Sequence, residues 1–149
     1  MIQRATREHI DMLSVAGVKV LNDLPRYASV KVDPEHTKGM LTAYLDVPVL
    51  GIFFKEVEGE VVGLFMGCVA APWFSPEKEM DEIMYWVRED HRTTNLAVRL
   101  LNTAEAWAKS LGAKRVNLAS ASGYETERVV RFYNYLGYKT SGTQCCKEI

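Results

Sequence analysis

The segment of residues 89–95 joins a predicted strand directly to a predicted helix, a position at which a protein can bind an anion. A helix begins with unpaired backbone N–H groups and about half a positive charge, so its start can hold a phosphate or a pyrophosphate. Arg92 stands at the mouth of this site, where it can add a charge-assisted contact. Most strand-to-helix loops share these features, so a solvated surface role for Arg92 stays open.

The surrounding elements alternate between strand and helix patterns. The predicted order is a strand at residues 2–5, a helix after Thr6, a helix from Asp33 to about Leu45, a hairpin of residues 49–57 and 61–70, a strand at 79–88, a helix at 96–111, a strand at 114–119, a helix at 125–136 and a final extended strand at 138–147. This α/β order, β-α-α-β-β-β-α-β-α-β, predicts a mixed central sheet. In such sheets, ligands bind beyond the carboxyl ends of strands.

Two motifs and the order of elements resemble the GNAT family of N-acetyltransferases. Residues 87–97, VREDHRTTNLA, are similar to the family's strand that ends in valine five residues before the R-x-x-G-x-G/A pyrophosphate loop. Residues 131–138, RFYNYLGY, are similar to its F-Y-x-x-L-G-F/Y segment. The resemblance covers nearly the whole chain. Within the family, the chain most resembles small acetyltransferase-like proteins of phages and bacteria. It implies the GNAT fold, in which the fourth and fifth strands splay apart around a cofactor cleft.

The resemblance also implies that the cosubstrate is acetyl-coenzyme A (acetyl-CoA). The residues expected to bind it are the strand backbone near Trp86 and Val87, the loop residues Arg92, Thr93, Thr94, Asn95, Leu96 and Ala97, and Thr126, where many members carry an asparagine. Thr93 and Asn95 replace the family's glycines. Because asparagine is the non-glycine residue that best tolerates the left-handed region, we expect Asn95 to adopt it and the loop to keep its shape. The β-branched side chain of Thr93 is expected to lower the affinity for the pyrophosphate. Thr126 could cap its helix instead, which is the commoner role for threonine.

Two residues are candidates for proton transfer. The resemblance gives Tyr133 the role of general acid toward the leaving thiolate, although such a tyrosine can also be core packing. We favour Glu82 as the base, resembling a glutamate of histone-type members, and its alternation with Met84 and Trp86 predicts an apolar setting that raises its pKa. The opposing interpretation is that Glu82 belongs to a solvated acidic rim with Glu77, Glu79 and Asp81.

The expected activity is direct transfer of an acetyl group to an unidentified primary amine, on a small molecule or a protein lysine. If the acidic stretch lines the acceptor entrance, cationic amines rank above anionic ones. The missing loop glycines support a second hypothesis, a GNAT-fold module that binds coenzyme A or a partner without turnover. A third hypothesis is a general α/β interaction domain with accidental motif matches. Neither the acceptor nor the oligomeric state follows from the sequence, and a homodimer stays open.

The composition limits the class of protein. We expect residues 1–149 to form one domain, since 48% hydrophobic and 25% charged residues are ordinary for a globular chain of this length. A net charge of −1 lacks the excess of positive charge that is typical of nucleic-acid binding. No apolar run approaches the roughly 20 residues of a membrane-spanning helix. Without an export signal we expect a cytoplasmic protein, in the host cytoplasm if a phage encodes it. Cys68, Cys145 and Cys146 fit no disulfide or metal pattern, so we expect reduced structural thiols and no metal.

Overall fold

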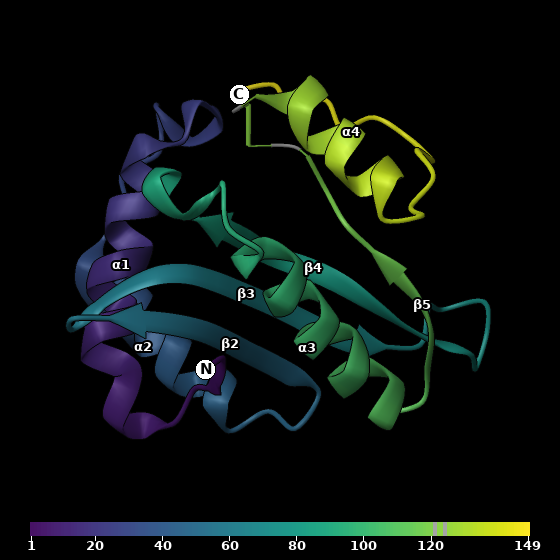
Figure 1. The fold of residues 1–149 in the computed structure, drawn as a ribbon, viewed down its shortest axis with the longest axis horizontal. Helices are drawn as coiled ribbons and strands as arrows, with labels where there is room; N and C mark the ends of the chain where they lie inside the picture. Colours follow the sequence, from purple (N-terminus) through teal and green to yellow (C-terminus); the bar gives the residue numbers. More distant parts are fainter. Residues whose placement is uncertain (121, 124) are drawn as a thin grey trace.

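The structure is a computed structural model that describes residues 1–120, 122–123 and 125–149. Its strands form one sheet in the order β1-β2-β3-β4-β5, in which neighbours are antiparallel except for the parallel pair β4 and β5 (Figure 1). The strands are β1 (Gln3–Arg4), β2 (Leu50–Val57), β3 (Glu60–Ala70), β4 (Lys78–Val87) and β5 (Ala113–Asn117), and the α-helices are α1 (Ile10–Asp23), α2 (Pro34–Leu45), α3 (Leu96–Ser110) and α4 (Thr126–Tyr135). The predicted mixed α/β order is confirmed up to α4.

Local signals explain where several elements begin and end. The Asp33 carboxylate caps α2 by accepting a hydrogen bond from the His36 N–H at 2.8 Å, and Pro34 follows at the first helical position. Glu58 and Gly59 both have positive φ, 53° and 81°, in the turn between β2 and β3. Two such residues match the right-handed twist of the flanking strands, so a tight hairpin forms. The Asp33 cap and the turn were predicted from the sequence, and β3 begins at Glu60, one residue earlier than expected.

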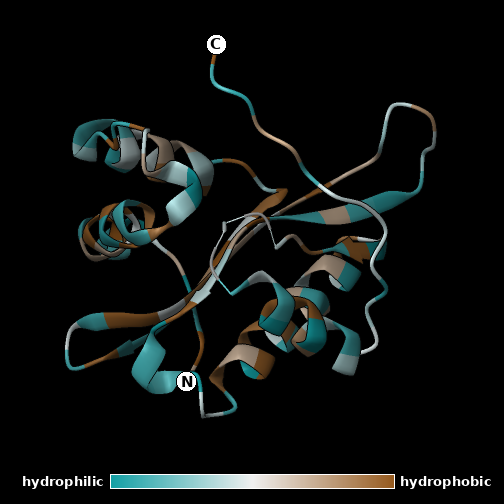
Figure 2. Cartoon of the chain, turned by 90° about the horizontal axis from the view of Figure 1, so that it is seen from above, coloured by the Kyte–Doolittle hydropathy of each residue, from teal (hydrophilic) through white to brown (hydrophobic). Residues whose placement is uncertain are grey.

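Helices cover both faces of the sheet. Figure 2 shows the sheet running diagonally between a helical layer on each side, with hydrophobic stretches along the strands. On the α1 and α2 side the core is formed by residues such as Leu13, Leu41, Phe54, Leu64 and Met66, and on the α3 side by Phe65, Val69, Met80, Leu100 and Leu101. Because β2 and β3 are buried on both faces, their sequences read as nearly continuous apolar runs.

The end of the chain differs from the prediction. Residues 139–149, all within the described part, form no strand and are exposed, so β5 is the edge of the sheet. The tail is instead held by polar contacts to the loop between α1 and α2. An Arg26 N–H donates to Gln144 Oε1 at 2.8 Å, and the Ser29 hydroxyl donates to a Glu148 oxygen. The prediction of a sixth strand was wrong because this polar tail has no apolar face to bury against the helices.

The cysteines follow the prediction only in part. All three thiols are free, Cys68 is half-buried, and Cys145 and Cys146 are exposed in the tail. The latter two are therefore not the buried structural thiols we expected. In the part of the chain that the structure describes, no helix is long and apolar enough to span a membrane, and no group of side chains is arranged to hold a metal.

Gly63 on β3 allows α3 to approach the sheet closely. A Cβ atom there would lie 2.8 Å from Leu100 Cδ1 and 3.1 Å from Leu96 Cδ2. Gly63→Ala should therefore lower the free energy of unfolding by about 1–3 kcal/mol. Gly39→Ala in α2 is the control, because no atom lies within 4 Å of its new methyl group and alanine favours the helix by about 1 kcal/mol. Urea unfolding of both variants measures this, and equal midpoints would contradict close packing at Gly63.

Candidate active site

Strands β4 and β5 separate halfway along β4. Their parallel pairing runs from Lys78 opposite Ala113 to Asp81 opposite Asn117 and ends there, while β4 continues to Val87. The backbone edge of β4 beyond Asp81 is thus left without β5 as a partner. A gap between parallel strands at their carboxyl ends is where open α/β sheets bind ligands.

A β-bulge at Ile83 marks the same point on the other side of β4. Met84 and Glu82 pair with successive residues of β3, and Ile83 between them has no partner. The extra residue reverses the alternation, so that Glu82 leaves the face of Met84 and Trp86 and joins that of Tyr85. The prediction that Glu82 shares a face with Met84 and Trp86 is therefore wrong.

The bulge brings Glu82 and Tyr133 to one residue, Ala119, just after β5. Glu82 Oε2 accepts a hydrogen bond from the Ala119 N–H at 2.9 Å, and the Tyr133 hydroxyl donates to the Ala119 carbonyl at 3.2 Å. The Tyr133 side chain is 9% exposed, and its ring stacks on Tyr85 with centroids 6.2 Å apart and planes 9° apart. Sequence reasoning missed Tyr85, whose only signal was its alternation with Val87. Its hydroxyl donates to the Ala97 carbonyl at 2.6 Å, which ties β4 to the start of α3.

Burial moves the pKa values of both candidate residues. Desolvation raises the pKa of Glu82 from 4.5 to about 7, against the opposing effect of the Ala119 N–H. Desolvation, followed by the nearby Glu82 charge, raises the pKa of Tyr133 far above its ordinary value of 10. At neutral pH Tyr133 therefore keeps its proton, while Glu82 can exchange one. The pair combines a proton donor and a proton acceptor in one place.

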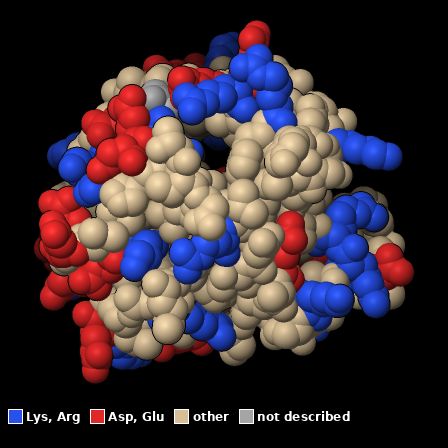
Figure 3. Space-filling model, viewed as in Figure 1, with Lys and Arg blue, Asp and Glu red and all other residues tan. Residues whose placement is uncertain are grey.

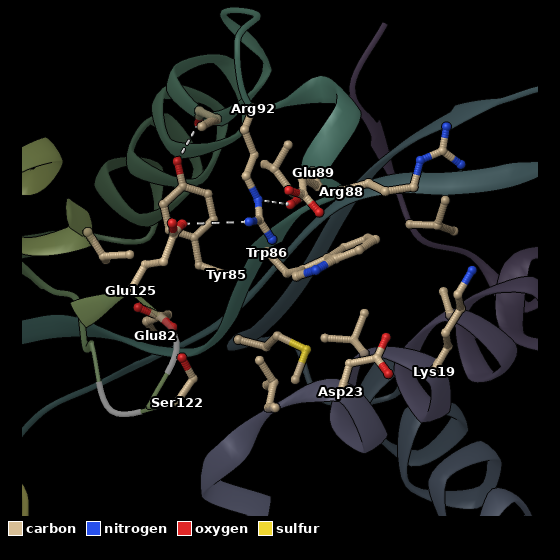
Figure 4. A pocket seen from close by; sticks show the side chains of 18 of the residues that line it. Lys19, Asp23, Glu82, Tyr85, Trp86, Arg88, Glu89, Arg92, Ser122 and Glu125 are labelled. Atoms are coloured by element: carbon tan, nitrogen blue, oxygen red, sulfur yellow. Dashed lines mark hydrogen bonds and ion pairs between the residues drawn. The ribbon is translucent and has the colours of Figure 1, made fainter. Parts of the chain in front are cut away.

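Both residues line a cleft of about 1050 Å³. One wall is formed by α1 and the turn η2 (Pro25–Tyr27), the floor by residues 82–89 of β4 and the loop after it, and the other wall by Ala119 and α4. Figure 3 shows the molecule hollowed at this place, and Figure 4 shows Glu82 and Tyr85 on one side of the cleft and Lys19 and Asp23 on the other. The cleft is large enough for a cofactor-sized molecule.

Arg92 crosses the end of the cleft next to the start of α3. Its Nε donates to the Val87 carbonyl at 2.9 Å, and its guanidinium lies 3.8 Å from a Glu125 oxygen (Figure 4). Four of the predicted binding residues are brought together on one stretch of the cleft surface, namely Trp86, Val87, Arg92 and Ala97.

The rest of the predicted loop lies differently. Thr93, Thr94 and Asn95 are exposed, and Leu96 is buried in the core. The prediction of a left-handed Asn95 is wrong, since its φ is −81°. The Thr94 hydroxyl accepts the Leu96 N–H at 3.2 Å, so the helix starts without a residue of positive φ.

Thr126 neither caps α4 nor lines the cleft. It is the exposed first residue of the helix, and the capping position is taken by Glu125, a non-glycine residue in the left-handed region with φ 43° and ψ 44°. The capping interpretation of Thr126 is therefore wrong. Tyr135, the second tyrosine on α4, is 87% exposed.

The acidic stretch before the bulge divides into two parts. Asp81 accepts a hydrogen bond from the Asn117 amide at 2.8 Å, and Glu79 lies 3.7 Å from Arg115. Glu77 and Glu79 line a separate small hollow of about 50 Å³, so only Glu82 of the four lines the main cleft. Glu77 and Asp81 are exposed, as the rim interpretation expects, whereas Glu79 is half-buried. The expectation that this stretch lines the acceptor entrance is wrong, except for Glu82.

Comparison with known proteins adds the family. The model of the Acetyltransferase (GNAT) family matches residues 19–138, whereas no curated protein sequence matches the chain. A transcriptional regulator from Bacillus halodurans C-125 has a similar structure, with a TM-score of 0.81, 16% identity, and coverage of 100% of this chain and 99% of that one. The structure of AAC(6')-Iy in complex with the bisubstrate analogue CoA-S-monomethyl-acetylneamine has a TM-score of 0.77 at 12% identity, and the match covers 100% of this chain and 97% of that one. Glucosamine-6-phosphate N-acetyltransferase from Arabidopsis thaliana has a TM-score of 0.76 at 16% identity, and the match covers 99% of this chain and 97% of that one.

These sequence identities are low, so the structural similarity is evidence of a shared fold alone. Over nearly the full length of both chains, they share the overall fold of this one. The family model covers most of the sequence and includes both the loop at Arg92 and the segment around Tyr133. The resemblance found in the sequence is thereby confirmed, and the chain belongs to the GNAT family of acetyltransferases.

Proposed function

We propose that the protein is an N-acetyltransferase that transfers the acetyl group of acetyl-CoA directly to a primary amine. The observation that carries this proposal is the meeting of Glu82 and Tyr133 at Ala119, inside the cleft and where β4 and β5 separate. An acid and a base held this close suit a reaction in which a nitrogen loses a proton and a sulfur gains one. The family assignment supports the same reaction.

The residues around the cleft fit acetyl-CoA. The unpaired edge of β4 near Trp86 and Val87 offers backbone groups to the pantetheine arm, as an added strand would. The start of α3 offers N–H groups to the pyrophosphate, and Arg92 beside it offers a guanidinium. Arg92 now contacts Val87 and Glu125, and we expect it to exchange Glu125 for the more highly charged pyrophosphate.

In the proposed reaction the side chains move protons while the substrates exchange one bond for another. Glu82 accepts a proton from the ammonium group of the acceptor, which frees the nitrogen lone pair. The nitrogen attacks the thioester carbonyl, a C–N bond forms, and the C–S bond breaks. Tyr133 donates its proton to the departing sulfur and recovers one from the acylated nitrogen, so that an amide and a thiol leave the site. A neutral tyrosine is available throughout because burial holds its pKa high.

Binding of acetyl-CoA is the first test. The ligand should raise the melting temperature in a saturable way, because it stabilises the folded state by mass action. Arg92→Ala should weaken the affinity about tenfold or more, since a hydrogen bond to a charged group contributes about 1.5–3 kcal/mol. Arg115→Ala, at a guanidinium that contacts Glu79 outside the cleft, is the matched control and should leave the affinity unchanged. Absence of any shift at millimolar acetyl-CoA would refute the proposal.

A second candidate is a GNAT module that binds coenzyme A or a partner without turnover. Thr93 and Asn95 stand where the family has glycines, and Glu125 lies beside Arg92. Saturable binding of acetyl-CoA without thiol release, over a panel of cationic, apolar and anionic amines, would favour this candidate over the enzyme.

A further inference from the structure

The α1 side of the cleft is an apolar trough. From α1 it is lined by Met12, Val15, Ala16 and Val20, and from β4 by Ile83, Met84 and Trp86. Val15 is 71% exposed and Ile83 is 44% exposed, although both are large aliphatic side chains. Apolar surface of this kind inside a concave site marks the place of an apolar ligand group.

The charged groups on this side balance one another. The wall carries Asp11, Lys19, Asp23 and Arg26, two of each sign. Asp11 forms an ion pair with Lys38 at 2.5 Å, and Arg26 lies over the Tyr27 ring with 5.4 Å to its centroid. Lys19 and Asp23 reach into the cleft together from α1 (Figure 4). A polycation therefore gains no electrostatic attraction from this wall.

The bulge connects the trough with the proton-transfer pair. It leaves Ile83 exposed to the cleft and turns Glu82 toward Tyr85 and Tyr133, and both residues line the same cavity. An acceptor whose ammonium group meets the carboxylate of Glu82 would thus lay its remaining atoms along Ile83 and Val15. Because the side chains along this path are apolar, they suit an acceptor whose remaining atoms carry no further charge.

We propose that the acceptor is a small monoamine whose single amino group is carried on an apolar aliphatic or aromatic body, and that Val15 and Ile83 select it. This inference rests on the proposed acetyltransferase function and names its substrate class. It replaces the ranking drawn from the acidic stretch, because Glu77, Glu79 and Asp81 do not line the cleft. Polyamines and aminoglycosides would have to place further ammonium groups against aliphatic side chains, at the cost of their hydration.

A panel of amines tests the substrate class. Release of coenzyme A would be measured as free thiol with 2-phenylethylamine, hexylamine, spermidine and kanamycin under the same conditions. We expect kcat/KM for the two apolar monoamines to exceed that for the two polycations by about tenfold or more, as hydrophobic pockets discriminate by this order. Faster turnover of spermidine or kanamycin would overturn the inference and leave the proposed function standing.

Val15→Glu tests the trough itself. It should raise KM for 2-phenylethylamine about tenfold with little change in kcat and in acetyl-CoA affinity. Val30→Glu is the matched control, because Val30 is 55% exposed and does not line the cleft. An unchanged KM in Val15→Glu would overturn the inference, as would a dimer seen by sedimentation that only this variant dissociates, since the apolar face would then be an interface between copies. Absence of thiol release with any amine, while acetyl-CoA still binds, would refute the proposed function and this inference with it.

Discussion

Tyr133→Phe should lower kcat by about 10²- to 10⁴-fold while leaving the affinity for acetyl-CoA unchanged. The substitution removes the hydroxyl that we propose protonates the leaving sulfur, and it keeps the ring that stacks on Tyr85. Among the described residues, the substitution removes one hydrogen bond, from the hydroxyl to the Ala119 carbonyl. The measurements are thiol release under saturating acetyl-CoA and a thermal-shift titration with the same ligand.

Tyr135→Phe is the matched control for this prediction. It removes the same atom from the same helix, at a side chain that is 87% exposed and outside the cleft. Its kcat should equal that of the wild type. A wild-type rate in Tyr133→Phe would show that Tyr133 is a packing residue, and equal losses in both variants would assign the effect to α4 as a whole.

Glu82→Gln should remove from the pH profile the rise near pH 7 that belongs to the Glu82 carboxyl group. In the wild type, kcat/KM should rise as the pH passes through about 7, because only the deprotonated carboxylate can accept the ammonium proton. The variant should be about 10²-fold or more slower at neutral pH, and higher pH should recover part of the rate as free amine becomes available. Glu79→Gln, on the same strand outside the cleft, is the control. An unchanged profile in Glu82→Gln would remove this residue from the mechanism.

The same variant has an effect on stability with a definite sign. The pKa of Glu82 is raised from 4.5 to about 7 in the folded state, so its contribution to stability is greatest below pH 4.5 and is lost as the pH rises through 7. At pH 8, Glu82→Gln should increase the free energy of unfolding by up to about 3 kcal/mol, at about 1.36 kcal/mol per pKa unit. Near pH 4 the two proteins should differ little. Urea unfolding at both pH values measures this, and a pH-independent difference would contradict a raised pKa of this half-buried carboxyl group.

The sequence by itself determined most of the elements and the identity of one candidate residue. The turn at Glu58 and Gly59, the Asp33 cap and the periodicity of α3 are local signals, so they could be predicted without neighbours. The motif around Tyr133 likewise needed no tertiary information. It fixed which tyrosine to choose, and the structure places that one, rather than Tyr135, inside the cleft.

Only the tertiary structure decided how the site is assembled. The bulge at Ile83 depends on pairing with β3, and it alone turns Glu82 toward Tyr133 and away from Trp86. The raised pKa of Glu82 depends on burial beside residues distant in sequence, since its carboxylate meets the Ala119 N–H. Register and burial are properties of contacts between segments, so a one-residue shift that reverses a side chain leaves no mark on local periodicity.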